Sequence, residues 1–262
     1  MKYFDTHTHT NYPPLSEEFQ EILKKLKENE IGINIVGCNK ETCELATQQV
    51  KYSTDFYCSL AIHPNDIDEW NNIEEMTTFL ENLYLDNKDK VLCIGECGLD
   101  YYYNNDEETK RKQKIAFEAQ INLAIKYNLP IMMHIREAHE DAQEIIAKYS
   151  HLNLTWIVHC FTSNKINALR YLELGCYLSI PGVITFKNSH ELREALQVIP
   201  LDKLLTETDA PWLTPMPYRG KTNYPYYLIH TNEFISNFLE ISLEELNKKL
   251  ILNACKALNI KC

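Results

Sequence analysis

Short apolar runs alternate with amphipathic stretches along almost the whole chain. The apolar runs are continuous rather than interrupted at every second residue, which is typical of parallel strands covered on both faces. The stretches between them carry apolar residues at helical spacing. The pattern therefore predicts repeated strand–helix units. The expected strands are Tyr3–Thr6, Ile33–Val36, Phe56–Ile62, Val91–Gly95, Ile131–Met133, Thr155–Val158, Cys176–Ile180 and Lys203–Thr206.

Helices are expected in the intervals between these strands. They are Glu17–Glu28, Glu41–Tyr52, Ile73–Leu85, Glu107–Tyr127, Glu137–Tyr149, Lys165–Leu174 and Ser189–Val198, with Tyr227–Leu239 and Ser242–Leu258 closing the chain. Eight strand–helix units in 262 residues take about 33 residues each, which is usual for a barrel. No linker or change of composition divides the chain. We therefore predict an α/β fold, a single (β/α)8 TIM barrel over residues 1–262.

The main irregular segment is Asp209–Tyr226, which holds four of the ten prolines and has no apolar periodicity. Structureless segments of this length within a compact domain are usually functional or disordered. Because this one follows the last strand directly, we expect it to lie over the mouth of the barrel.

The composition is that of an ordinary globular protein, with 45% hydrophobic and 24% charged residues. No apolar run is long enough to span a membrane, and the N-terminus lacks the features of a signal peptide. The nine cysteines are scattered without a Cys-x-x-Cys pair, which indicates neither a zinc knuckle nor a disulfide framework. Cys38 and others sit in or beside apolar strands, where a free cysteine behaves as a small buried hydrophobic residue. We expect a cytoplasmic protein with no membrane partner and, as the simplest assembly, a monomer.

The net charge is −11, from 37 acidic and 26 basic residues. An acidic protein has no general attraction to nucleic acid, whose binding depends largely on neutralising phosphates. A polyanionic substrate would therefore have to be held by metals and a few local cations.

Histidines and carboxylates recur where the expected strands end. His7 and His9 are two residues apart on an extended strand, so both imidazoles point the same way. Strand C-termini meet on one face of a parallel barrel, the face that carries the chemistry. Asp209 leaves the eighth strand, which ring closure puts beside the first, so it should face both histidines. Its alternative role is to cap the next segment.

A second group of candidates ends the middle strands. Glu96 follows the fourth strand, and His134 and His159 follow the fifth and sixth. Taken singly, Glu96 could cap a helix, and a lone histidine in such a place is more often a core residue. Together they indicate two neighbouring divalent cations, with Glu96 able to bridge them. Nitrogen and oxygen ligands without thiolate suit Zn²⁺, Mn²⁺ or Mg²⁺ and do not select among them.

Other residues are candidates for contacts to substrate. His63 ends the third strand and is expected to hydrogen-bond a substrate oxygen rather than a metal, while Asp5 could orient a ligand imidazole. The cations that could hold a phosphate are Arg136, Lys187, Arg219 and Lys221. The last two stand among tyrosines, which suits single-stranded nucleic acid, although an ordinary solvated loop explains them as well. For the remaining histidines we expect solvated or structural roles: His139, His151, His190 and His230.

These residues, in this order, resemble the TatD family of metal-dependent deoxyribonucleases, and the resemblance runs essentially end to end. It rests on the following motifs: Phe4-Asp-Thr-His-Thr-His9, Ile62-His63-Pro64, Gly95-Glu-Cys-Gly-Leu-Asp-Tyr101, Leu129-Pro-Ile-Met-Met-His134, His159-Cys-Phe161, Leu178-Ser-Ile-Pro-Gly182 with Thr185-Phe-Lys187, Glu207-Thr-Asp-Ala-Pro211 and Arg219-Gly-Lys-Thr-Asn223. The sequence departs mildly from the family's usual residues at Ala61 and at Thr162-Ser163. Neither departure touches a proposed ligand.

The resemblance implies two metal ions. His7, His9 and Asp209 would bind one, His134 and His159 the other, and Glu96 would bridge them. It also implies hydrolysis of phosphodiesters in DNA, as an exonuclease or in repair. Glu96, Asp209 and His63 would then be catalytic, with Asp209 helping to deprotonate the attacking water. The alternatives are a small-molecule amido- or phosphoester hydrolase on the same barrel and a non-catalytic binding protein.

Overall fold

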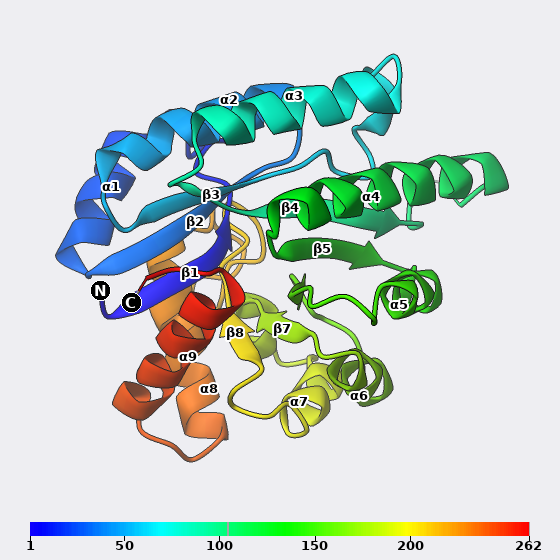
Figure 1. Ribbon diagram of the computed structural model, residues 1–262. Coiled ribbons are helices and arrows are strands. Elements are labelled where there is room, and N and C mark those ends of the chain that lie inside the picture. Colours follow the sequence, from blue (N-terminus) through cyan, green and yellow to red (C-terminus); the bar gives the residue numbers. More distant parts are fainter. Residues whose placement is uncertain (104, 262) are drawn as a thin grey trace.

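The computed structural model describes residues 1–103 and 105–261. Its strands form one parallel sheet in which each pairs with the next in chain order, and helices surround the sheet (Figure 1). The predicted (β/α)8 TIM barrel is confirmed. The strands are β1 (Tyr3–Thr8), β2 (Ile31–Gly37), β3 (Phe56–Leu60), β4 (Val91–Asp100), β5 (Ile131–Arg136), β6 (Trp156–Val158), β7 (Tyr177–Ile180) and β8 (Leu204–Thr206).

The helices follow the strands in turn. They are α1 (Phe19–Glu28), α2 (Lys40–Gln49), α3 (Ile73–Asp86), α4 (Glu107–Tyr127), α5 (His139–Lys148), α6 (Lys165–Glu173), α7 (His190–Leu196), α8 (Leu228–Phe238) and α9 (Leu243–Ala257). Short 3-10 turns are η1 (Val50–Tyr52), η2 (Ile67–Glu69), η3 (Gly182–Thr185) and η4 (Pro225–Tyr227). Within the described part of the chain, no helix has both the length and the apolarity needed to cross a bilayer.

Many of these helices begin where a polar side chain satisfies a free backbone amide. Asn39 starts α2 and accepts a hydrogen bond from the amide of Thr42, whose own hydroxyl accepts one from the backbone amide of Asn39. Asn72, Asp106 and Asn164 cap α3, α4 and α6 in the same position. Each such cap stabilises a helix by about 1 kcal/mol. The caps therefore fix the helix starts independently of the core.

The barrel closes between its last and first strands just beyond the ends of β8 and β1. The Asp209 amide donates to the carbonyl oxygen of His7 at 3.0 Å, and the His9 amide donates to that of Ala210 at 2.8 Å. Asp5 contributes to this seam by accepting hydrogen bonds from the amides of His7 (3.2 Å) and Thr208 (2.9 Å). The expectation that Asp5 orients an imidazole is therefore wrong, because Oδ1 is bound by these two amides and Oδ2 by the Thr208 hydroxyl.

The fourth strand runs further than the sequence suggested, from Val91 to Asp100 instead of ending at Gly95. Its pairing with β5 shifts register between Ile94 and Cys97 and then resumes. Such an irregularity re-aims a side chain without ending the strand. Glu96 lies at this shift, inside β4. The third strand, in turn, ends at Leu60 rather than Ile62.

A layer of small polar residues fills part of the barrel interior. The hydroxyls of Thr6 and Ser179 lie 3.0 Å apart, and the Asn34 amide donates to Ser59 Oγ at 2.7 Å and to the Thr6 carbonyl at 3.0 Å. All four side chains are buried. Because these groups are partnered, they are tolerated in the core, and they link β1, β2, β3 and β7.

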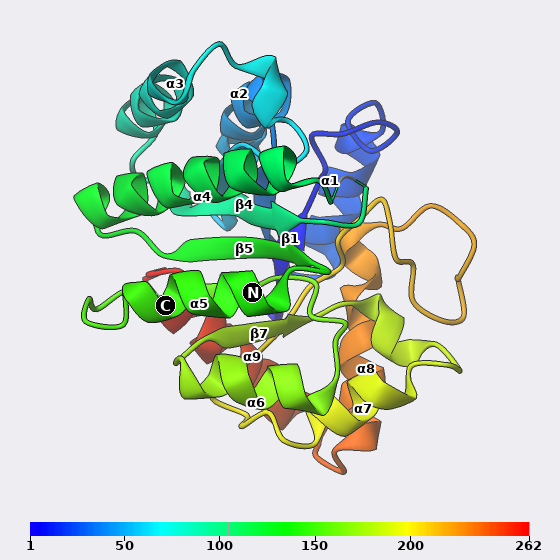
Figure 2. The same ribbon diagram turned by 90° about the vertical axis from the view of Figure 1, so that its right-hand side faces the viewer.

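The segment after β8 is irregular as predicted, and it projects beyond the strand ends (Figure 2). Side chains nevertheless tie it down. The buried Asn223 amide donates to the carbonyls of Thr208 (2.8 Å) and Trp212 (2.5 Å), and the Met216 amide donates to Thr185 Oγ1 at 2.8 Å. The loop therefore rests on both β8 and η3.

Candidate metal centre

Six side chains with ligand atoms meet at the C-terminal end of the barrel. They are the six predicted metal ligands: His7, His9, Glu96, His134, His159 and Asp209. His134 and Asp209 are partly exposed, and the other four are buried. The structure therefore brings together every residue that the sequence singled out as a ligand, while their roles in binding stay a prediction.

The first set surrounds the Nε2 atoms of His7 and His9, which lie 3.0 Å apart. Asp209 Oδ1 is 3.7 and 3.3 Å from these two nitrogens, and Glu96 Oε1 is 3.6 and 3.5 Å from them. Ligands about 2.0–2.1 Å from a tetrahedral cation would lie about 3.3–3.4 Å from one another. The observed separations bracket this value. The donor set thus fits a small divalent cation.

The second set uses the other oxygen of Glu96. Oε2 lies 2.7 Å from His159 Nε2 and 3.2 Å from His134 Nδ1, and these two nitrogens are 3.3 Å apart. Three nitrogen and oxygen donors at such spacing fit a cation with one position left for water or substrate.

Glu96 is shared by the two sets, one carboxylate oxygen facing each. The shift of register in β4 places this side chain between β1 on one side and β5 and β6 on the other. Gly98 makes the approach of β4 to β5 possible: its φ is +146°, and a Cβ there would lie 2.1 Å from the His134 carbonyl oxygen. A residue with a side chain would push these strands apart.

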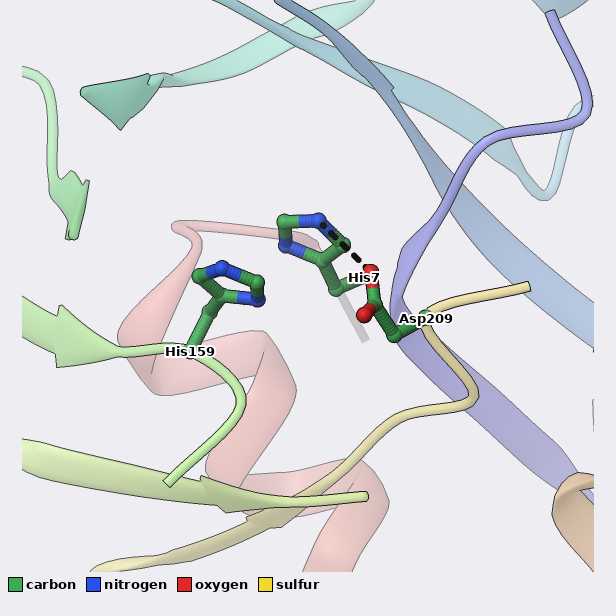
Figure 3. Close-up of side chains that lie close together, drawn as sticks. All are labelled: His7, His159 and Asp209. Atoms are coloured by element: carbon green, nitrogen blue, oxygen red, sulfur yellow. Dashed lines mark ion pairs between the residues drawn. The ribbon is translucent and has the colours of Figure 1, made fainter. Parts of the chain in front are cut away.

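The two sets are in contact with each other. The rings of His7 and His159 are stacked with centroids 3.8 Å apart, and His159, His7 and Asp209 lie side by side in Figure 3. Asp209 reaches the cluster from a left-handed backbone conformation, φ 52°, which aspartate adopts more readily than most residues. The ligand atoms therefore form one continuous polar cluster.

Charge is distributed unevenly over this cluster. Burial alone would raise the pKa of Glu96, but the nearby His159 and His7 outweigh it and hold that pKa well below its usual range. For His159, burial is outweighed by the carboxylates of Glu96 and Glu207, which raise its pKa well above the usual value. The carboxylate shared by the two sets is thus kept ionised, the form that binds a cation.

Carboxylates that the sequence analysis missed orient the histidines from behind. Glu207 Oε1 lies 3.3 Å from His159 Nδ1, and Asp100 Oδ2 lies 3.2 Å from His134 Nε2. Such partners fix the tautomer and the orientation of a ligand ring. Glu207 is two residues before Asp209, and Asp100 four after Glu96. Each stands in the same family motif as the ligand candidate beside it and is separated from it by an even number of residues. The alternation of side chains along a strand could therefore have indicated both.

Cys38 was also missed. It was expected to be a small buried hydrophobic residue, but it is only half-buried and its Sγ lies 3.2 Å from Glu96 Oε1 and 3.7 Å from His9 Nδ1. The thiol is therefore a hydrogen-bond donor to the shared carboxylate rather than a filler of the core.

Comparison with known proteins identifies the family. The family model described as TatD-related DNase matches residues 4–259. The chain belongs to the TatD-related DNase family. It is 36% identical to an uncharacterized metal-dependent hydrolase of Mycoplasma genitalium, over 98% of each chain, and 35% identical to the uncharacterized metal-dependent hydrolase YabD of Bacillus subtilis, over 98% of this chain and 99% of that one. A crystal structure of a TatD homologue from Escherichia coli K12 has the same fold, with a TM-score of 0.91 at 23% identity over 99% of each chain.

In this TatD-family chain, His63 stands beside the second set. Its ring lies 4.3 Å from that of His134, centroid to centroid, and His63, Asp100 and His134 form a further group of possible ligands. Nδ1 of His63 accepts a hydrogen bond from the Asn65 amide at 3.1 Å. The remaining nitrogen, Nε2, then carries the proton of the neutral ring. Burial, followed by the neighbouring His134, lowers the pKa of His63 to about 3.

The predicted phosphate-binding cations of the TatD-family chain are all exposed. Arg136 lies with its guanidinium carbon 3.7 Å from the ring centroid of Tyr102. Arg219 covers Phe186 at 4.2 Å, beside Lys187, and Lys221 Nζ is 5.7 Å from the ring of Tyr218. Three of the four cations therefore lie on aromatic rings, and Arg219 lies on the ring of the residue that precedes Lys187.

Proposed function

We propose that this chain is a deoxyribonuclease that uses two divalent cations to hydrolyse phosphodiester bonds in DNA, acting on single strands or ends as an exonuclease. The observation that carries the proposal is the position of Glu96, whose two oxygens face two separate sets of ligand atoms. The family to which the chain belongs supports the same activity.

His7, His9 and Asp209 would hold one cation and His134 and His159 the other, with Glu96 shared. When bound, such a pair supplies an activated water nucleophile near neutral pH and neutralises the charge of a phosphoryl group. The donors are oxygen and nitrogen atoms, which suit Mg²⁺, Mn²⁺ and Zn²⁺. The Cys38 sulfur also lies 3.2 Å from Oε1 of the shared carboxylate.

Asp209 would accept the proton of the attacking water. Both of its contacts with the histidines of the first set use Oδ1. Oδ2 is therefore the atom left for a proton. The side chain keeps 13% of its surface exposed, so water can reach it.

His63 would donate a hydrogen bond from Nε2 to a non-bridging phosphate oxygen, because its Nδ1 is already an acceptor for the Asn65 amide. Arg136 follows His134 by two residues and would bind the next phosphate of the chain. Its position over Tyr102 limits the entropy lost when it binds. A guanidinium held in this way can offer two parallel donors to a phosphate.

A second candidate, a hydrolase for a small ester or amide, is favoured by the net charge of −11. An acidic protein repels a long polyanion at a distance. The exposed cations, Arg136, Lys187, Arg219 and Lys221, favour DNA instead, because a small substrate held at the metals has no need of them. We therefore place the nuclease first.

A metal-titrated assay distinguishes the nuclease from the small-molecule hydrolase. Chelated and dialysed protein is given Mg²⁺, Mn²⁺ or Zn²⁺ and offered single-stranded DNA, duplex DNA and a small phosphodiester. We expect metal-dependent release of nucleotides, fastest from the single strand, which the Glu96→Ala variant loses and the control His151→Ala, altered at an exposed residue, retains. Turnover of the small diester with none of either DNA would contradict the nuclease and favour the second candidate.

A further inference from the structure

An indole is exposed beside the candidate metal centre. Of the three tryptophans, Trp156 is buried and Trp70 is partly buried, but 46% of Trp212 is exposed. Trp212 follows Asp209 by three residues on the loop after β8. A large aromatic side chain left half in water next to a polar pocket loses the benefit of burial, so its exposure calls for a partner.

Trp212 is held firmly in this exposed position. Its amide donates to the Asp209 carbonyl at 3.0 Å, and its own carbonyl accepts from the buried Asn223 side chain. Its ring meets the edge of His9 at 5.2 Å and is tilted against Tyr12 at 5.4 Å, both between centroids. Tyr12 is itself 44% exposed. The two rings thus form a fixed aromatic surface at the border of the first ligand set.

We propose that Trp212, with Tyr12 beside it, is a stacking subsite for one unpaired nucleobase of the strand whose phosphodiester lies at the metal centre. The inference rests on the proposed nuclease function and specifies its substrate. A base has an aromatic face whatever its identity, and stacking on an aromatic side chain binds it without reading sequence.

The charge of the protein explains why stacking would matter here. With a net charge of −11, the chain gains little from general attraction to phosphates. Stacking depends on no net charge, so it supplies affinity that the surface as a whole does not. In a duplex both faces of each base are already stacked on neighbours. The subsite therefore selects single strands and frayed ends.

The test uses strands that the metal-loaded protein cannot cleave readily. The ligands are a thymidine strand with phosphorothioate linkages and a strand of the same length and linkages built from abasic tetrahydrofuran units. The proteins are wild type, Trp212→Leu, which keeps an apolar side chain without an aromatic face, and Trp212→Phe, which keeps such a face. Affinity is measured by fluorescence anisotropy, and metal content is measured on the same samples.

We expect Trp212→Leu to bind the thymidine strand about 5- to 150-fold more weakly, the factor that corresponds to about 1–3 kcal/mol per stacked base. Trp212→Phe should keep most of the affinity. The abasic strand should bind equally to all three proteins, with equal metal content. Tryptophan emission of the wild type should be quenched by the thymidine strand alone, and this quenching should be absent in Trp212→Leu, where Trp70 and Trp156 remain.

Two results overturn the subsite alone: equal losses for both strands, which would make Trp212 a part of the pocket wall, and an undiminished preference for the thymidine strand in Trp212→Leu. If the wild type binds neither strand, the nuclease function fails and the subsite fails with it.

Discussion

Glu207 Oε1 lies 3.3 Å from Nδ1 of His159, and both side chains are buried. The same oxygen accepts the backbone amide of Cys160 at 2.6 Å, which fixes the carboxylate in place. If a cation displaced the Nε2 proton, His159 would keep the Nδ1 proton that faces Glu207 and would present Nε2 to the second ligand set. Glu207 therefore acts through His159, as a positioning residue.

Replacing Glu207 by Ala should weaken metal binding at the second set about 10- to 100-fold, the usual effect of removing a group that orients a ligand histidine. The first set should keep its metal. Metal content after dialysis against buffered Zn²⁺ or Mn²⁺ measures the difference, with His151→Ala as the control. Loss of both metals, or of neither, would contradict the role given to Glu207.

A second prediction concerns the shared carboxylate. Glu96→Ala removes the carboxylate whose two oxygens face the two sets, so occupancy should fall at both. Glu207→Ala should lower metal occupancy at the second set only. The comparison of metal stoichiometry in these two variants tests whether Glu96 bridges. Unchanged metal content in Glu96→Ala would remove that assignment.

Chelation should abolish hydrolysis while leaving the fold largely intact, because the barrel core is built from apolar side chains that do not depend on the ligand atoms. The midpoint of thermal unfolding should fall, since each bound cation stabilises the native state by about 2.7 kcal/mol at one hundred times its dissociation constant. Circular dichroism and calorimetry measure both effects. Full turnover after complete removal of metal would contradict the two-cation mechanism.

Much of this site could be predicted from sequence because it obeys two regular rules. Alternation along a strand indicated His7 and His9, and convergence of parallel strand ends brought Asp209 to them. Glu96 lies among the other candidate ligands as expected. Its strand, however, continues to Asp100, because local periodicity does not reveal a shift of register that depends on the pairing with β5.

The features that were missed depend on three-dimensional contacts. Cys38 looked like other cysteines in apolar strands, and only the fold brings its thiol to Glu96. Trp212 stands in a loop without periodicity, so its meeting with His9 and Tyr12 could not be derived from spacing. Asp5 resembled an orienting carboxylate, but the seam between β1 and β8 takes up its oxygens.

Gly98 allows a test of how the fold supports the centre. In Gly98→Ala, the new Cβ would meet the His134 carbonyl oxygen at 2.1 Å, at a backbone angle that disfavours side chains. The free energy of unfolding should fall by more than about 1 kcal/mol, and the second set should bind metal more weakly. Gly175→Ala is the matched control: it has a positive φ, and no heavy atom lies within 4 Å of its Cβ. If both variants lost the same free energy of unfolding, the backbone angle would account for the whole effect and the contact with His134 for none of it.

The last prediction tests the nuclease against the small-molecule hydrolase. Arg219 lies over Phe186, and Lys221 lies by Tyr218, and both cations are exposed. Replacing Arg219 and Lys221 by Ala should weaken DNA binding without displacing metal, because both cations stand on the loop. For a single strand, the slope of log affinity against log salt should also flatten by about 0.7 for each phosphate that the variant no longer neutralises.

A small phosphodiester that reaches only the metals should be hydrolysed almost as fast as by the wild type. The charge-matched control is the double replacement of Lys248 and Lys249 on α9 by Ala, which lowers the net charge by the same amount. If this control flattened the salt dependence as much, the effect would be one of overall charge. Equal losses on long and short substrates would instead make the loop a structural cover over the barrel. A loss confined to DNA is what a nuclease requires, since a hydrolase for small esters has no use for cations so placed.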